Sequence, residues 1–460
     1  MSAAGLIEAQ KKMRAAGVNS AAVDVFSHYY GQLEAGATGL ILEDSIEPLL
    51  TPDALAGIAI DDETARDAFA KTAIIKLNGG LGTSMGMDRA KSLLPVRDGK
   101  SFLDLIVGQV RHARETTGAR VPLILMNWFR TRDDSLAALA AYPDLAVDGL
   151  PLDFLQNAEP KIRVDDLTPV SWPADPTLEW CPPGHGDIYT ALLASGVLEQ
   201  LLDAGFHYAS ASNSDNLGAV PSPLIAGWFA ASGAPYAAEL CPRTLADKKG
   251  GHLAIRKSDG RLILRDTAQT APQEMDFFTD EFRHPFFHTN NLWFDLEKLY
   301  SALTARGAVL GLPLIRNVKN VDPTDSSSPE VFQIETAMGA AIEVFEGATA
   351  IVVGRDRFLP VKTTNDLLVL RSNAYALADD GALRLAVDAA PLVDLDSRYF
   401  KTMSAFDARF PFGAPSLSGA TSLTVSGDWT FGADVVVTGA VALRDAGAPE
   451  FVPDGTTLGE

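Results

Sequence analysis

The segment TAIIKLNGGLGTSMGMDRAKS, residues 72 to 92, places a short apolar run, a glycine-rich loop and a lysine in immediate succession. A strand followed by a glycine-rich loop is typical of phosphate-binding sites, because glycine can adopt positive φ and lets the backbone approach a ligand closely. The loop holds four glycines and two hydroxyl side chains: Gly79, Gly80, Gly82, Gly86, Thr83 and Ser84. It predicts a phosphate site, although a tight strand-to-helix connection with a solvated lysine would look the same in isolation.

Two well-known phosphate loops do not fit this segment. The dinucleotide fingerprint needs G-x-G-x-x-G, whereas Gly80, Gly82 and Gly86 carry one extra residue between the second and third glycines. The P-loop needs a glycine directly before its lysine, and Ala90 precedes Lys91 here. The missing dinucleotide pattern argues against a nicotinamide or flavin oxidoreductase.

Around the loop, short β-rich runs alternate with helical stretches. Further apolar runs follow at VPLILM from Val121, HYASAS from His207 and YAAELC from Tyr236, and amphipathic segments separate them. This alternation predicts a parallel sheet with crossover helices. The stretch HLAIRKSDGRLILRD from His252 interrupts the pattern, and its Asp-Gly pair predicts a hairpin inserted on the substrate side.

The two ends of the chain differ from this middle part. Apolar residues at helical spacing between Ile7 and Leu50 predict N-terminal helices. The segment SLTVSGDWTFGADVVVTGAVAL from Ser422 has short β runs at nearly even spacing, which predicts stacked β-helix coils or an antiparallel sandwich. We therefore expect an N-terminal helical segment (1–70), a catalytic α/β domain (71–385) and a C-terminal β domain (386–460).

Composition narrows the class of protein. In the 460 residues, 47% are hydrophobic and the formal net charge is −21, which indicates a folded protein that repels nucleic acid and anionic membranes. With only two cysteines, Cys181 and Cys241, neither a disulfide framework nor a cysteine metal cluster is expected. The N-terminus lacks the apolar core of a signal peptide, so we expect a cytoplasmic protein without nucleic-acid or membrane partners.

The loop LNGGLGTSMG, followed by the lysine and serine at 91 and 92, resembles the signature of the UTP:glucose-1-phosphate uridylyltransferases, or UDP-glucose pyrophosphorylases. The similarity continues in family order over roughly residues 70 to 375, and FDARFPFGAPSL to GDWTFGADV is similar as well. The further matching blocks are PPGHGDIY (182–189), SNSDNLGA (212–219), ADKKGGHL (246–253), HTNNLWF (288–294), QIETAMGAA (333–341) and RFLPVKTTNDLL (357–368).

The resemblance implies a fold and a reaction. The fold would be a doubly wound, mixed α/β sheet of the Rossmann-like nucleotidyltransferase type, and the C-terminal β-helix would be left-handed. Such a β-helix offers a stackable face for a homo-oligomer, although a monomer covered by the N-terminal helices is equally consistent with the sequence. The reaction would be in-line attack of glucose 1-phosphate on the α-phosphorus of UTP, giving UDP-glucose and pyrophosphate with help from Mg²⁺. Because both reactants are anions, such a site must neutralise charge and hold the reacting groups in line.

Three charged residues match the family's reactive positions. Lys91 and Lys362 match its two phosphate-binding lysines and are the expected catalytic residues. Asp215 follows the run HYASAS, where the end of a sheet strand points into the ligand crevice of an α/β fold, so we expect it to hold Mg²⁺ with substrate oxygens. The ordinary alternatives are a surface lysine or an ion pair for each lysine, and an Asx turn or a helix cap for Asp215.

The remaining candidates bind rather than react. His185 is expected on the uridine side and not as a general base, since an ionised phosphate nucleophile has no proton to lose. Gln156 can pair its amide with a uracil edge, although a surface glutamine is the alternative. The expected UTP-binding set is Leu77, Asn78, Gly79, Gly80, Gly82, Thr83, Gln156, Gly184 and His185. The expected sugar-phosphate set is Asp215, Asn216, Gly250, Gly251, Asn290, Asn291 and Glu335.

Two other functions stay open on the sequence. One is uridylyl transfer to N-acetylhexosamine 1-phosphate or to several sugar phosphates. The other is a non-catalytic nucleotide-sugar-binding scaffold, which the presence of Lys91, Asp215 and Lys362 together disfavours.

Overall fold

The computed structural model describes residues 2–244, 247 and 250–459, so part of the ADKKGGHL block lies outside the described residues. No helix in the described part of the chain is both long and apolar enough to cross a membrane. The helices are α1 (Ser2–Ala15), α2 (Ser20–Glu34), α3 (Asp62–Ala70), α4 (Phe102–Thr117), α5 (Arg132–Leu139), α6 (Ile188–Ala194), α7 (Val197–Asp203), α8 (Pro223–Ser232), α9 (Met275–Phe278), α10 (Leu296–Ala305), α11 (Thr364–Arg371), α12 (Ser397–Phe400) and α13 (Met403–Arg409).

The strands are short and many. They are β1 (Ile46–Pro48), β2 (Asp53–Ala54), β3 (Thr72–Asn78), β4 (Pro95–Arg97), β5 (Lys100–Ser101), β6 (Leu123–Asn127), β7 (Asp153–Leu155), β8 (Glu159–Pro160), β9 (Ile162–Arg163), β10 (Trp180–Cys181), β11 (Tyr208–Asn213), β12 (Tyr236–Pro242), β13 (His252–Arg256), β14 (Leu262–Arg265), β15 (Phe286–Asp295), β16 (Ile315–Asn320), β17 (Glu330–Glu335), β18 (Thr349–Val352), β19 (Tyr375–Leu377), β20 (Leu383–Leu385), β21 (Leu392–Leu395), β22 (Ser416–Val425), β23 (Trp429–Phe431), β24 (Val436–Leu443), β25 (Glu450–Val452) and β26 (Thr457–Leu458).

One eight-stranded sheet organises the middle of the chain, in the order β2-β18-β12-β15-β11-β3-β6-β7. Its neighbouring strands are parallel except for β15, which runs antiparallel to both β11 and β12. The four apolar runs identified in the sequence are β3, β6, β11 and β12. The predicted mixed α/β sheet is therefore confirmed. Strand β3 is almost entirely buried, as expected for a central strand covered on both faces.

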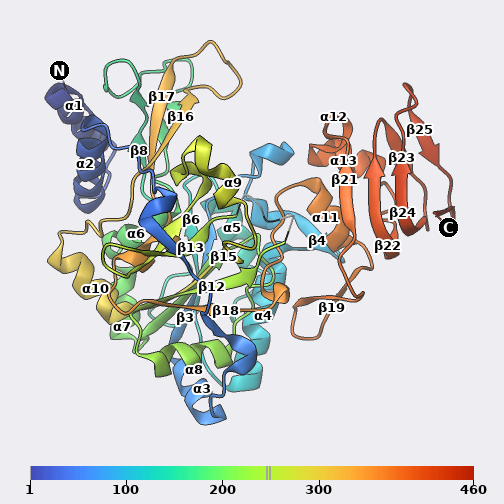
Figure 1. Ribbon diagram of the computed structural model, residues 1–460, viewed down its shortest axis with the longest axis horizontal. Helices are drawn as coiled ribbons and strands as arrows, with labels where there is room; N and C mark the ends of the chain where they lie inside the picture. Colours follow the sequence, from blue (N-terminus) through green and yellow to red (C-terminus); the bar gives the residue numbers. More distant parts are fainter. Residues whose placement is uncertain (1, 245–246, 248–249, 460) are drawn as a thin grey trace.

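Helices cover both faces of this sheet (Figure 1). Helices α4 and α8 pack into one apolar cluster, with Phe102 and Phe229 buried in it, whereas α6, α7 and α10 pack into another, with Leu192 and Leu299. The stretch from Asp187 to Gly205 forms two helices rather than one. Gly196 has φ 76° and ends α6, so that α7 starts as a separate helix.

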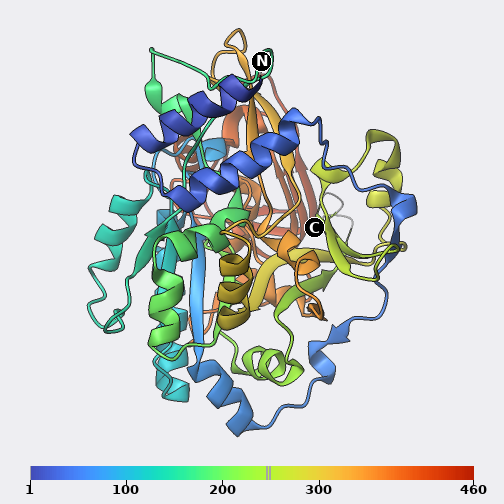
Figure 2. The ribbon, with the colours of Figure 1, turned by 90° about the vertical axis from the view of Figure 1, so that its left-hand side faces the viewer.

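The N-terminal helices α1 and α2 lie side by side across the outside of the molecule (Figure 2). Phe26 and Tyr30 of α2 are buried against Ile162, Leu314 and Ile334. The predicted helical region is shorter than expected, because α2 ends at Glu34. The chain then continues mostly without helix, and β1 pairs antiparallel with β13 of the predicted hairpin.

The C-terminal strands stand apart from the large sheet (Figure 1). Strands β21, β22, β24 and β26 form one sheet and β23 and β25 another, and every one of these pairings is parallel. The antiparallel sandwich is therefore wrong for the described strands. The buried side chains Phe410 and Leu417 belong to the same apolar cluster as Phe102 of α4, so packing is continuous between the two sheets.

Candidate functional site

The glycine-rich loop and the aspartate loop leave the sheet at neighbouring positions. Strands β3 and β11 are parallel neighbours, and their register places Leu77 opposite Asn213. The backbone N–H of Ser214 then donates to the carbonyl of Leu77 at 3.0 Å, which ties the two exits together. The carboxyl ends of parallel strands are where open α/β folds bind ligands.

Lys91 connects three segments that are far apart in the sequence. Its backbone N–H donates to the carbonyl of Gly80 at 2.9 Å and folds the glycine-rich loop back on itself. Its Nζ donates to Oδ2 of Asp215 at 2.6 Å and also to the carbonyl of Val361. Lys362 follows directly and is exposed, while its backbone N–H donates to Oδ2 of Asp366 at 2.8 Å.

These segments enclose two adjoining hollows that share His185, Asn213 and Asp215. The loop hollow, of about 320 Å³, is also lined by Leu77, Gly79, Gly80, Lys91, Met126, Gln156, Pro182, Gly184 and Ser214. The hairpin hollow, of about 230 Å³, is also lined by Asp247, Gly250, Gly251, Leu264, Asp266, Phe287, His288, Thr289, Asn290, Ala337, Phe358, Pro360 and Lys362. Lys91, Asp215 and Lys362 thus face one continuous cleft.

His185 has its two ring nitrogens in different situations. Nδ1 accepts the backbone N–H of Met338 at 3.0 Å, which leaves the ring proton of the neutral imidazole on Nε2. Burial lowers the pKa of His185, so the neutral form is favoured. A histidine in this state offers an N–H donor rather than a proton acceptor.

Gln156 and Gly184 form one wall of the loop hollow. Nε2 of Gln156 donates to the carbonyl of Gly184 at 2.7 Å, so this amide is ordered rather than free at the surface. Gly184 has φ 77°, and a Cβ there would lie 2.6 Å from the carbonyl oxygen of Thr336. Only glycine fits this contact between the His185 loop and the segment after β17.

Two of the predicted sugar-binding amides lie inside the protein instead. Asn216 donates to Oδ1 of Asn291 at 3.0 Å and accepts the backbone N–H of Leu359 at 2.8 Å. Asn291 donates to Oε2 of Glu239, at 3.1 Å. Both asparagines are 2% exposed, because they join β11 and β15 to the segment that begins at Arg357. Neither residue lines the two hollows, and their assignment as sugar ligands stays a prediction.

Other predicted residues also lie away from the cleft lining. The amide of Asn78 is buried and donates to Asn127 and Ser135, both at 2.7 Å. Gly82 and Thr83 belong to the glycine-rich loop but line neither hollow. Glu335 lines a separate pocket behind Gly184. The sequence could not separate these residues from true lining residues, because they sit within the same motifs.

Comparison with known proteins identifies the family. The model of the family described as UTP--glucose-1-phosphate uridylyltransferase matches residues 23–438. The chain belongs to this family. It is therefore a uridylyltransferase, as the resemblance of its motifs indicated.

Relatives and solved structures agree with this assignment. The UTP--glucose-1-phosphate uridylyltransferase of Hordeum vulgare is 37% identical over 99% of this chain and 95% of its own length. The UDP-glucose pyrophosphorylase of Leishmania major is 42% identical, with a TM-score of 0.92 over 99% of this chain and 98% of that one. A Trypanosoma brucei structure titled UDP-glucose phosphorylase is 41% identical, with a TM-score of 0.91 over the same shares.

Several lining residues of this uridylyltransferase cleft were not singled out in the sequence. Asn213 and His288 lie within the quoted family blocks, and Asp266 directly follows the hairpin strand β14. Burial lowers the pKa of His288 to about 4, so this imidazole is neutral at physiological pH. Asn213 and Asp266 could have been identified as candidate lining residues from the sequence, because each is a polar residue where a predicted strand ends.

Proposed function

We propose that the cleft transfers the uridylyl group of UTP to glucose 1-phosphate and releases pyrophosphate. The observation that carries the proposal is the convergence of Lys91, Asp215 and Lys362 at the exits of β3 and β11. The family assignment supports the same reaction, and solved relatives are titled complexes with UDP-glucose.

UTP is assigned to the loop hollow. Gly79 and Gly80 offer open backbone for the phosphates, while Gln156 and His185 provide amide and imidazole groups for the uridine. Leu77 and Gly184 complete this wall. The lining supports the assignment, since it combines glycine backbone with side-chain hydrogen-bonding groups.

Glucose 1-phosphate is assigned to the hairpin hollow. Gly250, Gly251 and Asn290 line it together with Lys362, so polar groups for hydroxyls lie near a cation for the phosphate. The two hollows meet at Asp215, which is where the two phosphates would react.

In the proposed reaction, a phosphate oxygen of glucose 1-phosphate attacks the α-phosphorus of UTP. A new P–O bond forms as the bond to the β-phosphate oxygen breaks, and that electron pair leaves with pyrophosphate. Lys91 and Lys362 balance the negative charge that gathers around the α-phosphorus. His185 donates from Nε2 and holds the substrate without removing a proton.

Asp215 is the residue proposed to hold Mg²⁺. Within the described residues, no three His, Cys, Asp or Glu side chains are grouped to hold a metal ion. One carboxylate fits Mg²⁺, which commonly uses one or two protein carboxylates together with substrate phosphates and water. When bound, the ion would supply charge stabilisation to the phosphates.

The proposed organisation keeps the segments 1–70, 71–385 and 386–460. Parallel pairing of the C-terminal strands supports a β-helix, for which we propose left-handed coils and a face for a homo-oligomer. Two free, buried cysteines support a cytoplasmic location.

A panel of sugar 1-phosphates tests the function. We expect pyrophosphate release with UTP and Mg²⁺ to be fastest, by kcat/KM, with glucose 1-phosphate. Higher kcat/KM with N-acetylhexosamine 1-phosphate would favour the other uridylyltransferase reaction. Release with none of the sugars, despite measurable UDP-glucose binding, would favour a scaffold.

A further inference from the structure

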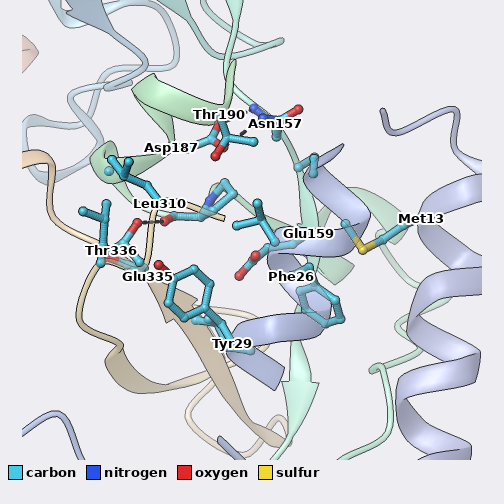
Figure 3. Close-up of a pocket in the computed structure, with 17 residues that line it drawn as sticks. Met13, Phe26, Tyr29, Asn157, Glu159, Asp187, Thr190, Leu310, Glu335 and Thr336 are labelled. Atoms are coloured by element: carbon cyan, nitrogen blue, oxygen red, sulfur yellow. Dashed lines mark hydrogen bonds between the residues drawn. The ribbon is translucent and has the colours of Figure 1, made fainter. Parts of the chain in front are cut away.

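A second cavity lies behind the loop that carries His185, between α2 and the end of β17 (Figure 3). Val25, Phe26 and Tyr29 of α2 form one wall, and Glu159, Asp187 and Glu335 lie on the other sides. We call this cavity the α2 pocket. Its volume is about 20 Å³, enough for one water-sized group. It shares no lining residue with the loop hollow or the hairpin hollow.

The charges around the α2 pocket are all of one sign. Its three carboxyl side chains have no Lys, Arg or His beside them among the lining residues. Glu159 is 3% exposed, and its Oε1 has no hydrogen-bond partner in the described part of the chain. Asp187 accepts the backbone and side-chain N–H groups of Asn157 at 2.7 and 2.8 Å. A buried carboxyl oxygen is thus left facing a small cavity without a donor.

Such an arrangement is costly unless something neutralises it. Burial, and then the neighbouring charges of Asp187 and Glu335, raise the pKa of Glu159 well above its usual range. Burial also raises the pKa of Asp187 to about 7. A proton on Glu159 removes the charge, whereas a cation in the pocket would instead favour the ionised carboxylates.

The residues that line the α2 pocket favour one kind of cation over another. The α2 pocket is separate from the substrate cleft, so a multivalent metal there would need several protein ligands at once, and no such group of carboxyl, imidazole or thiol side chains occurs within the described residues. An ammonium group is satisfied differently, because each N–H bond can reach a separate acceptor.

We propose that the α2 pocket binds ammonium, a small nitrogen cation, with Glu159 as its principal acceptor. Glu335 provides a second carboxylate across the pocket. The site belongs to the junction between the N-terminal helices and the catalytic sheet, so a bound cation stabilises that junction. Binding does not depend on the reaction in the cleft.

Thermal unfolding of the full chain at about pH 8 tests this proposal, because Asp187 is then largely ionised. We expect about 0.1 M ammonium chloride to raise Tm by about 1 °C or more over equal concentrations of tetramethylammonium or potassium chloride. Tetramethylammonium has no N–H donor. Equal Tm values in all three salts would overturn the proposal, and an equal rise with potassium would overturn the choice of a nitrogen cation.

Matched variants locate the effect. We expect Glu159→Gln to lose the ammonium-specific rise in Tm, whereas Glu346→Gln, which alters a side chain that is 92% exposed, keeps it. A full rise in Glu159→Gln would overturn the assignment. If Glu159→Gln does not fold, Glu335→Gln tests the site instead. We expect it to lose at least half of the rise in Tm, and a full rise would overturn the assignment.

Discussion

The ammonium of Lys91 lies 2.6 Å from Oδ2 of Asp215, although the two residues are 124 positions apart. Their side chains are 16% and 22% exposed, so the pair sits at the cleft wall and is partly screened by solvent. Each group holds the other in the cleft. In the proposed complex, the phosphates of UTP would take the lysine and a metal ion would take the carboxylate.

Replacing Lys91 by Ala should lower kcat/KM for pyrophosphate release by about a hundredfold or more, because the transition-state charge loses a cation. Lys71→Ala is the control, since Lys71 also pairs with a carboxylate, that of Asp67, but on the exposed surface. We expect wild-type turnover for Lys71→Ala. Unchanged turnover in Lys91→Ala would remove the central role assigned to this lysine.

Replacing Asp215 by Asn should raise the Mg²⁺ concentration for half-maximal activity by about tenfold or more, because a neutral amide is a weaker ligand than a carboxylate. Activity is measured across a Mg²⁺ series at saturating UTP. Asp276→Asn changes an exposed carboxylate of α9 and should leave the series unchanged. If Asp215→Asn reaches half-maximal activity at the same Mg²⁺ concentration as the wild type, the metal is held by other groups.

Asn216 should act by positioning Lys362. Its side chain accepts Leu359 N–H and donates to the carbonyl of Arg357, and its backbone pairs with Pro360. Asn216→Ala should therefore lower kcat by about tenfold with a smaller change in the KM for UTP, and lower the unfolding free energy by about 1–3 kcal/mol.

Asn373→Ala is the control that distinguishes a loss of Lys362 positioning from a general loss of stability. Asn373 accepts the backbone N–H groups of Leu417 and Ser418 at 2.9 and 3.1 Å, away from the cleft. We expect this variant to lose stability in urea unfolding while keeping its kcat. An equal loss of kcat in both asparagine variants contradicts the positioning role.

It could be predicted from the sequence that the loops carrying Lys91 and Asp215 lie together, whereas the roles of these residues stay predictions. Lys91 and Asp215 follow β3 and β11, and parallel pairing of those strands brings their loops together. Asn216 and Asn291 could not be placed in this way, since their partners, Glu239 and Arg357, come from distant segments. A polar side chain in a motif can satisfy either a ligand or a buried network, and only the fold decides which.

The positions of several strands could be predicted from the sequence, but the direction of one strand could not. Apolar runs identified β3, β6, β11 and β12, but nothing local to β15 indicated that it would run antiparallel between two of them. Strand direction depends on how the connections cross, not on the composition of the strand. Likewise, even spacing of C-terminal β runs left two architectures open until parallel pairing separated them.

Lys76 should make stability depend on pH. Burial, and the nearby charge of Arg357, lower the pKa of Lys76 to about 7, despite Glu239. The unfolded chain then binds more protons between about pH 7 and 10, so the unfolding free energy should rise with pH, by at most about 1.4 kcal/mol per unit. Lys76→Met should flatten this rise in urea unfolding, whereas Lys257→Met, at an exposed lysine, should not.

A substitution at Gly80 should affect UTP binding without affecting the stability of the fold. A Cβ at Gly80 would have no described atom within 4 Å, and its backbone is not in the left-handed region, yet the residue lines the loop hollow. Gly80→Ala should therefore leave the unfolding free energy within about 0.5 kcal/mol of wild type. If UTP phosphates approach this backbone as proposed, the added methyl group should raise the KM for UTP by about tenfold.

Gly57→Ala is the matched control, because a Cβ there also meets nothing within 4 Å and Gly57 lines neither hollow. It should change neither stability nor KM. An unchanged KM in Gly80→Ala would place the phosphates away from this part of the loop. A loss of stability as large as the loss of affinity would instead indicate that the methyl group acts on the fold, so the two measurements must be made on the same variants.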